Sequence, residues 1–320
     1  MIVRWGIDSL SGVLDELGCS APYLLATKRH HDLASQAGRW SELPTDDIRA
    51  IAAVLGAADA LVALGGGSTI DTAKAVSAET RLPVVSIPTT YSGAEWTPFF
   101  GVRDQERRQR GGGAGAWVAG IVYEPELTIE LPRSVTVGTA LNALAHCAEA
   151  LYVEGHNAEA DEHALAGARL ISDRLPRVVE DRGDHEARTG LLRGACHAGA
   201  ALAGSMLALG HAMAQALGGR YGLPHGAMNA LCLPPALRFN AEAVPEAVAR
   251  FGAAVGSVAA PADRVEELAR LGGFERLRDF GVPEAELADV AAAVVQRPGA
   301  RANPRPATAA EVEQLLRSIW

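Results

Sequence analysis

The sequence lacks a long hydrophobic run: in its 320 residues, no stretch offers the roughly 18 consecutive strongly apolar residues that a membrane-spanning helix needs. Its beginning, MIVRWGIDSL, lacks the apolar segment of a secretory signal. The four cysteines form no CxxC pair, which argues against a zinc ribbon or a disulfide scaffold. We therefore expect a cytoplasmic protein with reduced thiols and no membrane partner.

Basic residues are also in short supply, because 29 Lys and Arg stand against 38 Asp and Glu and give a net charge of −9. Nucleic-acid binding depends on Lys and Arg that neutralise phosphates, so the acidic excess argues against a general nucleic-acid surface. A local basic pocket for an anionic metabolite is compatible with it. With 48% hydrophobic residues, the chain is long enough for two domains with sizeable cores.

The sequence does contain a glycine-rich stretch, LVALGGGSTIDTAKA, from Leu61 to Ala75. Its apolar start predicts a buried strand, and the residues after the three glycines predict a helix that carries Ser68, Asp71 and Lys74. Glycines allow positive φ angles and bring backbone N–H groups close to a ligand, while the helix start adds unpaired donors and a positive dipole end. The stretch fits a phosphate or pyrophosphate. An ordinary glycine turn capped by Ser68 fits it as well.

Strands and helices alternate in the N-terminal part of the chain. This alternation predicts a Rossmann-like α/β fold with a parallel, doubly wound sheet and a ligand site at the carboxyl ends of the strands. A hydroxyl-rich loop after Pro88 is expected opposite the glycine turn, and the charged, glycine-rich residues 103–115 are expected to form a mobile surface loop that acts as a lid if it closes over a ligand. The expected helices span 8–18 and 46–56, and the expected strands span 21–27, 61–64, 83–88 and 117–131.

After Pro132 the composition turns to Ala, Leu and Glu with helical periodicity, and no strand is predicted. We expect an α/β domain at 1–132 and an all-helical domain at 133–320. In the helical part, Asn142 and His146 are four residues apart and share one helix face, and His211 and His225 follow. Three imidazoles with a polar partner suit zinc or iron, but a histidine in an alanine-rich helix is more often a packed, hydrogen-bonded residue than a metal ligand.

Five motifs, in this order, resemble the iron-containing alcohol dehydrogenase superfamily, which also includes dehydroquinate synthase-like relatives. The resemblance covers almost the whole chain. Three details are more similar to maleylacetate reductases than to the metal-dependent alcohol dehydrogenases: the tyrosine in PTTYSGAEWTP, Asn142 in place of a metal-binding aspartate, and the tail ANPRP. The motifs are GGGSTIDTAKA, IPTTYSGAEWTPFFG, YEPELTIELP, LNALAHCAEALY and ALGGRYGLPHGAMNALCLP.

The resemblance implies a dehydroquinate synthase-like architecture, with a dinucleotide-binding domain followed by a helical domain and the active site in the cleft between them. It implies reduction of the carbon–carbon double bond of maleylacetate by NADH or NADPH, which gives 3-oxoadipate in aromatic-compound breakdown. The glycines and Ser68 would hold the cofactor pyrophosphate, Asp71 would orient the turn or reach the cofactor, and the hydroxyl residues would contact adenosine or the nicotinamide side. These cofactor positions are Gly65, Gly66, Gly67, Ser68, Asp71, Thr89, Thr90 and Ser92.

The superfamily's metal positions fall on Asn142, His146, His211 and His225. A neutral amide at Asn142 removes the anionic ligand, so we expect no tightly bound metal. The three histidines would then bind the substrate's carboxylate and keto oxygens, with His211 as the first choice of proton donor because hydride addition to an enone spreads charge into an enolate. Asn142 would contact the substrate, and two arginines would clamp its carboxylates; they are Arg220 and Arg305.

Three departures from the resemblance leave the substrate open: Gln215 stands where a further histidine is usual, Ala94 stands where a serine is expected, and the segment 27–45 is short. Lys28 and Arg29 after the first strand favour NADPH weakly. Alternatives are a metal-dependent alcohol dehydrogenase, a non-redox lyase or cyclase, and a nucleotide-binding paralogue without turnover. By analogy, we expect a homodimer that acts on a small dicarboxylate or enone.

Overall fold

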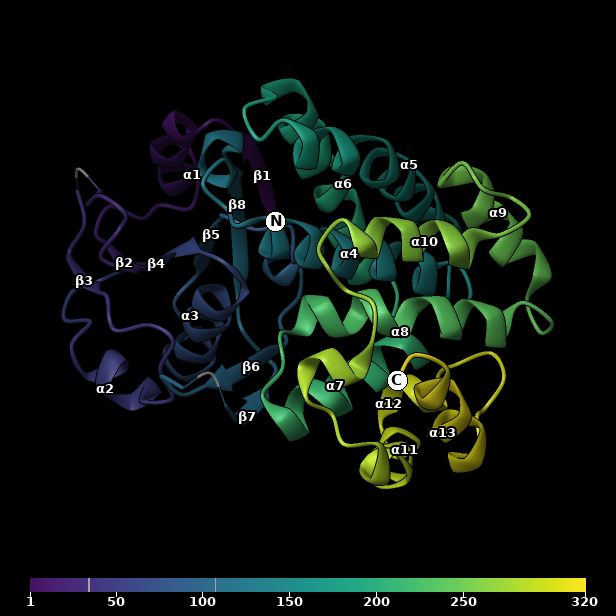
Figure 1. The fold of residues 1–320 in the computed structure, drawn as a ribbon. Helices are drawn as coiled ribbons and strands as arrows, with labels where there is room; N and C mark the ends of the chain where they lie inside the picture. Colours follow the sequence, from purple (N-terminus) through teal and green to yellow (C-terminus); the bar gives the residue numbers. More distant parts are fainter. Residues whose placement is uncertain (34, 107) are drawn as a thin grey trace. The chain divides into compact units, whose positions relative to one another are not determined.

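The computed structural model describes residues 1–33, 35–106 and 108–320. The chain divides into two compact units, Met1–Glu130 and Leu131–Trp320, drawn in purple to blue and in teal to yellow in Figure 1. The domain break expected from the sequence lies two residues further along than this division. The roles expected for the two domains remain predictions. In the described residues, no helix is both long and apolar enough to cross a membrane.

The first unit contains a six-stranded sheet in the order β1-β8-β5-β4-β2-β3, and every neighbouring pair is parallel. The predicted α/β class is confirmed. Two edge strands, β1 and β3, were missed, because β1 is only partly buried and β3 is three residues long. The strands are β1 (Ile2–Trp5), β2 (Pro22–Ala26), β3 (Gly38–Trp40), β4 (Ala60–Gly65), β5 (Val84–Pro88) and β8 (Val118–Tyr123).

Successive residues of each strand point to opposite faces of this sheet, and both faces are covered. On one face, Val62 and Val85 pack with residues of α1 (Leu10–Glu16), which follows the short 3₁₀ helix η1 (Ile7–Ser9). On the other face, Leu61 and Val84 pack with residues of α2 (Ile48–Ala53) and α3 (Gly67–Thr80). Burial on both faces explains the almost uninterrupted apolar sequence of the central strands.

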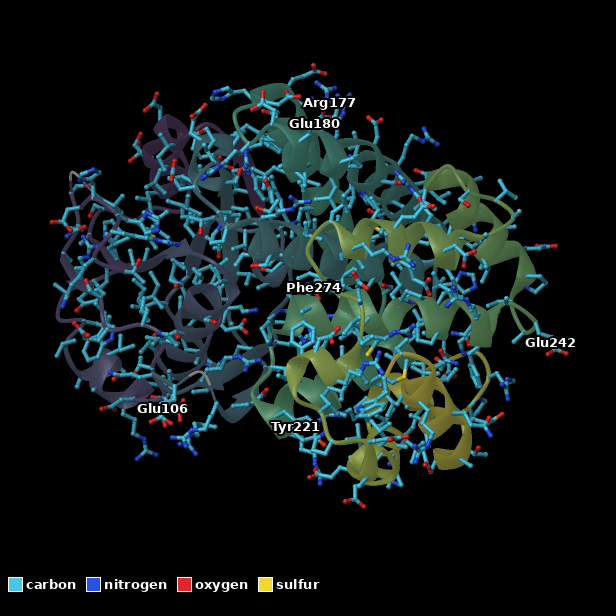
Figure 2. All side chains as sticks on the ribbon, viewed as in Figure 1. Glu106, Arg177, Glu180, Tyr221, Glu242 and Phe274 are labelled. Carbon is cyan, nitrogen blue, oxygen red and sulfur yellow. The ribbon has the colours of Figure 1, made fainter. Side chains whose placement is uncertain are left out.

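The connection between β5 and β8 contains the 3₁₀ helix η2 (Ala94–Trp96) and a two-stranded antiparallel hairpin of β6 (Phe100–Arg103) and β7 (Gln109–Gly113). The expectation of an irregular loop at 103–115 is therefore wrong for β7, although every residue of β7 is exposed. Glu106, between the two strands, is also exposed (Figure 2). Its carboxylate pairs with Arg108. Arg107 lies outside the described residues, and the lid role of this segment remains a prediction.

The strand predicted over 117–131 is also shorter than expected. β8 ends at Tyr123, and the 3₁₀ helix η3 (Pro125–Thr128) follows, with Glu124 as its cap. Proline fixes φ and lacks an N–H donor, so Pro125 suits the first turn of a helix better than the middle of a sheet.

The second unit is helical, and none of residues 131–320, all of which are described, lies in a strand. The predicted all-helical class is confirmed. Helix α4 is buried at every residue from Ala140 to Ala150, so it forms the core against which its neighbours pack. The helices are α4 (Arg133–Ala150), α5 (Ala158–Glu180), α6 (His185–Ala203), α7 (Leu209–Tyr221), α8 (His225–Asn240), α9 (Pro245–Ala254), α10 (Pro261–Arg270), η4 (Leu277–Phe280), η5 (Glu284–Glu286), α11 (Leu287–Val294), α12 (Pro298–Arg301) and α13 (Ala309–Ser318).

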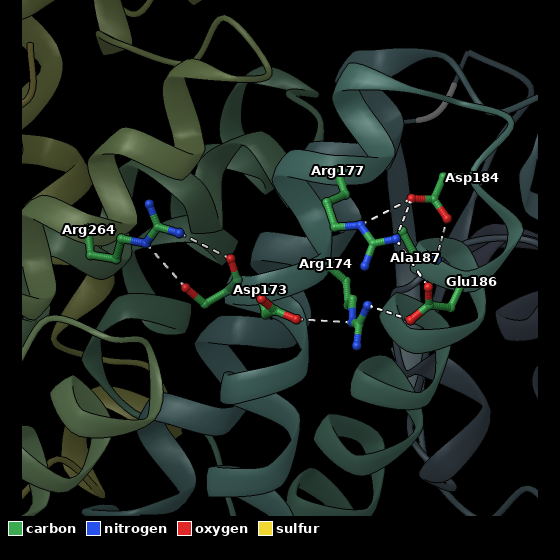
Figure 3. Close-up of polar contacts among 8 residues, drawn as sticks. Asp173, Arg174, Arg177, Asp184, Glu186, Ala187 and Arg264 are labelled. Carbon is green, nitrogen blue, oxygen red and sulfur yellow. Dashed lines mark hydrogen bonds and ion pairs between the residues drawn. The ribbon is translucent and has the colours of Figure 1, made fainter.

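Charged side chains fix the turn between α5 and α6 (Figure 3). Asp184 caps α6 by accepting a hydrogen bond from the Ala187 N–H (2.9 Å), and it also pairs with Arg177 (2.8 Å). Arg174 pairs with Glu186 in the first turn of α6 (2.9 Å). A carboxylate near a helix N-terminus stabilises the helix, so these contacts hold the start of α6 against the end of α5.

Candidate functional site

The three glycines of the predicted phosphate turn join β4 to α3. None has a positive φ, and Gly66 is extended with φ −81° and ψ −174°, so the conformational argument made from the sequence is wrong at these positions. Close packing requires them instead. A Cβ on Gly65 would lie 2.6 Å from Thr69 Oγ1, and one on Gly66 would lie 2.9 Å from Thr90 Cγ2.

The hydroxyl-rich loop after β5 lies directly against this turn, as the sequence predicts. The Thr89 N–H donates to the Gly65 carbonyl (3.0 Å), and a Cβ on Gly67 would lie 3.3 Å from Ser92 Oγ. Thr89 Oγ1 is buried without a partner, and Gly66 supplies no side-chain cap to α3. The first N–H groups of a helix have no partner within it, so the turn is a suitable place for a pyrophosphate.

Asp71 and Lys74 brace this region rather than face a ligand. Asp71 pairs with Lys74 (2.8 Å) and accepts from the Gly101 N–H of β6 (3.1 Å). The Lys74 ammonium, which is 1% exposed, donates to the carbonyls of Ala94 (2.7 Å) and Phe99. Of the two roles considered for Asp71, the contacts support orientation of the surrounding chain.

A buried carboxyl group that the sequence did not reveal lies in the same loop. Glu95 Oε1 accepts from the Tyr123 hydroxyl (2.8 Å), and that hydroxyl accepts from the Trp96 indole N–H (2.7 Å). Glu95 Oε2 is buried without a partner. Burial raises the pKa of Glu95, because removal from water disfavours the charged form.

In the helical unit, the three predicted histidines come together from α4, α7 and α8. The rings of His146 and His211 stack with their centroids 4.7 Å apart, and His225 lies 6.0 Å from His211 at a tilt of 48°. His211 is fully buried, and His225, the first residue of α8, is half-buried. We call these three rings the imidazole cluster.

Glu149 orients His211, and sequence reasoning missed it. Its carboxylate accepts from the Ala208 N–H (2.6 Å), the His211 N–H (3.0 Å) and His211 Nδ1 (2.8 Å). Because the carboxylate only accepts, Nδ1 of His211 carries the proton, and Nε2, which is buried without a partner, presents its lone pair when the ring is neutral. The available signal was that the one carboxylate of this helix lies at i+3 from His146.

Burial lowers the pKa of His146 well below its usual value, and proximity to His211 and His225 lowers it further. His146 is therefore neutral at physiological pH, and its Nδ1 is buried without a partner. A neutral imidazole can accept a hydrogen bond or a metal, but it is a poor proton donor.

Asn142 joins the imidazole cluster through a second amide that the sequence did not reveal. Asn229 donates from Nδ2 to Asn142 Oδ1 (2.6 Å), and the same nitrogen lies 3.0 Å from His225 Nε2. Asn229 is at i+4 from His225 on α8, which is the spacing that could have indicated it. The two amides hold the position of the His225 ring.

The structure does not place Arg220 and Arg305 with the imidazole cluster. Arg220 lies nine residues after His211 on α7, beside Tyr221 at the helix end (Figure 2), and it pairs with Glu286 (2.7 Å). Arg305 pairs with Glu311 (2.7 Å) and lies over the Phe239 ring. Both guanidinium groups are already engaged, so the contacts give no support to the predicted carboxylate clamps.

Comparison with known proteins identifies the family of this chain. A model described as "Fe-containing alcohol dehydrogenase family, C-terminal" matches residues 136–320, and one described as "Iron-containing alcohol dehydrogenase" matches residues 24–114. The chain belongs to the iron-containing alcohol dehydrogenase family.

Relatives within this family include maleylacetate reductases. That of Burkholderia cepacia is 37% identical over 82% of this chain and 74% of its own length, and that of Pseudomonas sp. strain P51 is 33% identical over 98% and 93%. The crystal structure of maleylacetate reductase from Rhizobium sp. strain MTP-10005 has a TM-score of 0.90, 29% identity, and coverage of 100% of this chain and 95% of that one. The resemblance expected from the sequence motifs is confirmed.

The expectation of no tightly bound metal is wrong. The family is described as iron-containing, and that description conflicts with an inference that rested on Asn142 alone. The residues present are of the type that binds iron, since His146 and His211 each have a buried ring nitrogen without a partner. The other ring nitrogen of His211 donates to the Glu149 carboxylate, as metal-binding histidines commonly do. Within the described ranges, no three His, Cys, Asp or Glu side chains already form a metal-ligand group.

Proposed function

We propose that this chain is an NAD(P)H-dependent reductase of the maleylacetate reductase type. A hydride adds to one carbon of the double bond of maleylacetate, the π electrons move through the conjugated carbonyl to give an enolate, and a proton at the neighbouring carbon completes 3-oxoadipate. The observation that carries the proposal is the imidazole cluster with His211 fixed by Glu149, in a chain that is 33–37% identical to maleylacetate reductases.

Two histidines of the cluster take different parts in this proposal. With its proton on Nδ1, neutral His211 has only a lone pair on Nε2, so it binds rather than donates. His225 Nε2 faces the Asn229 amide donor, which leaves the ring proton on Nδ1. We therefore move the role of proton donor from His211 to His225, the half-buried member of the cluster.

Iron, where bound, would be held by the unpartnered nitrogens of His146 and His211 with Asn142 nearby, and it would supply a Lewis acid that polarises the substrate carbonyl. The protein's own contribution is to keep His146 neutral and to fix the His211 ring through Glu149. The apolar surroundings in α4 exclude water from these groups, which strengthens every charge interaction there.

The cofactor is proposed to bind at the glycine turn of the first unit, with its pyrophosphate at the start of α3 and with Thr90 and Ser92 alongside. The preference for NADPH over NADH remains a prediction. The Lys28 ammonium, one of the two groups that suggested it, pairs with Glu42 (2.8 Å), so this contact lends it no support. The homodimer and the cytoplasmic location are also part of the proposal and rest on analogy and on the unpaired cysteines.

The test is to follow NADH and NADPH oxidation optically with freshly generated maleylacetate, in buffers with and without added ferrous iron. We expect oxidation of one nicotinamide per 3-oxoadipate formed. Disappearance of maleylacetate without oxidation would instead indicate a non-redox reaction. No reaction with either cofactor in either buffer would contradict the proposed function.

A further inference from the structure

The half-buried residue Gln215 lies one turn of α7 from His211. In residues 209–218, all of which are described, Gln215 is the one residue that is not buried. It is at i+4 from His211, so both side chains lie on the same face of α7, about 6 Å apart along the axis. A ligand held by the imidazole cluster therefore has Gln215 as a neighbour on this helix.

A guanidinium group lies beside Gln215 and is poorly satisfied. Arg297 Nη1 is 3.5 Å from Gln215 Oε1, at the outer limit of a hydrogen bond, and its Nε is buried without a partner. A Cβ on Gly219, the next residue of this face, would lie 3.8 Å from Arg297 Nη2. Arg297 thus runs along the face that His211, Gln215 and Gly219 define.

Arg297 differs in this respect from the two arginines that the sequence suggests as carboxylate clamps. Arg220 and Arg305 have carboxylate partners, whereas no carboxylate among the described residues pairs with Arg297. Its pKa is lowered by burial, with no acidic neighbour to offset the effect. A half-buried guanidinium has five donors, and water and one long amide contact satisfy them poorly.

We propose that Arg297 and the side-chain amide of Gln215 bind a carboxylate group of the substrate. The inference rests on the proposed function, which supplies maleylacetate as the substrate and so identifies the carboxylate. Maleylacetate has one carboxylate two carbon–carbon bonds from its keto carbon and one three bonds away. With the keto oxygen at the imidazole cluster, we assign the nearer carboxylate, which 4-oxopent-2-enoate lacks, to Arg297 on the next turn of α7. The Gln215 NH₂ donates to that carboxylate while its carbonyl faces Arg297, which a histidine at 215 would not do in the same way.

The test measures whether Arg297 recognises a second carboxylate. Binding of adipate and of hexanoate, which differ by one carboxylate, is measured by calorimetry for the wild type and for Arg297→Leu, Arg297→Lys and Arg301→Leu. Arg301, the last residue of α12, donates to Gln296 Oε1 (3.3 Å) and serves as the matched control for Arg297, which caps the start of the same helix. Thermal melts establish that each variant is folded.

We expect Arg297→Leu to weaken adipate binding by about 10- to 100-fold, as for loss of a hydrogen bond to a charged group. Arg297→Lys should lie between, and Arg301→Leu should match the wild type. No weakening of adipate binding by Arg297→Leu, equal weakening by Arg301→Leu, or wild-type protein that binds adipate no better than hexanoate would overturn the inference.

Kinetics separate this inference from the proposed function. If the wild type turns over maleylacetate, Arg297→Leu should lower its kcat/KM by the same factor while leaving 4-oxopent-2-enoate, which has one carboxylate, unchanged. If the wild type does not turn over maleylacetate but the adipate difference is found, the proposed function is wrong and the dicarboxylate site stands. Unchanged kcat/KM for maleylacetate in Arg297→Leu would overturn the carboxylate site while leaving the reductase function intact.

Discussion

Replacing Glu149 by glutamine tests the imidazole cluster at its most buried polar contact. The carboxylate is 0% exposed and accepts three hydrogen bonds, two from backbone N–H groups and one from His211 Nδ1. Glutamine has the same shape but only one acceptor oxygen, so its NH₂ group must face at least one of these N–H donors. One donor then loses its acceptor inside the protein.

The expected magnitude follows from that count. Loss of one hydrogen bond to a charged acceptor lowers the free energy of unfolding by about 1.5–3 kcal/mol. For a unit of this size, 1 kcal/mol corresponds to roughly 2–4 °C, so Tm should fall by about 3–12 °C. Because the His211 ring loses the partner that fixes its tautomer, kcat should fall by about 10- to 100-fold.

The measurement combines a thermal melt with maleylacetate reduction. Glu284→Gln is the control, because Glu284 is 51% exposed and pairs with Arg317 at the surface, where an ion pair contributes at most about 1 kcal/mol. A Glu149→Gln protein that melts and turns over like Glu284→Gln would refute the assignment of Glu149 as the group that positions His211.

Three further substitutions test other parts of the structure. Asn142→Asp should raise zinc or iron affinity at least about 10-fold by calorimetry, because it adds an anionic donor that can still accept from Asn229; unchanged affinity would remove Asn142 from the metal set. Gly66→Ala places a Cβ 2.9 Å from Thr90 and should raise the KM for NAD(P)H about 10-fold or more, whereas Gly12→Ala, whose Cβ meets nothing within 4 Å, should not. The raised pKa of Glu95 means that the folded state binds its proton more tightly, so wild-type stability should fall relative to Glu95→Gln as pH rises above 4.5; a pH-independent difference in Tm between the two would contradict this.

The fold could be predicted from local sequence because its strongest signals are local. The apolar run of β4, the glycine turn and the start of α3 are contiguous, and burial of β4 on both faces leaves a continuous apolar pattern. Strands β1 and β3 lack that pattern because they lie at the sheet edges and are partly exposed. The sequence suggests positive φ angles as the reason for glycine at 65 and 66, whereas the structure shows that Thr69 and Thr90 leave no room for a Cβ. These contacts depend on how the chain packs, and the local sequence does not reveal them.

The candidate site was predicted less completely because its partners come from different helices. Helical spacing linked Asn142 to His146, but the contact between Glu149 on α4 and His211 on α7 depends on how the helices pack. The pairing of Gln215 with Arg297 spans 82 residues and has no local signal. Predicting metal binding from the charge of Asn142 failed for a related reason, since two unpartnered imidazole nitrogens were not visible in the sequence.

Two glycines explain how three helices bring the imidazole cluster together. A Cβ on Gly226 of α8 would lie 2.5 Å from the Gly138 carbonyl of α4, and one on Gly210 of α7 would lie 2.9 Å from Glu149 Oε1. Each glycine is adjacent in sequence to a histidine of the cluster, at Gly210-His211 and His225-Gly226. Real Cβ atoms do not approach backbone atoms so closely, so a side chain at Gly226 must move α8 away from α4, and the adjacent His225 would move with it, away from Asn142. A side chain at Gly210 must displace either the Glu149 carboxylate or α7, and either shift disturbs the contact between Glu149 and His211.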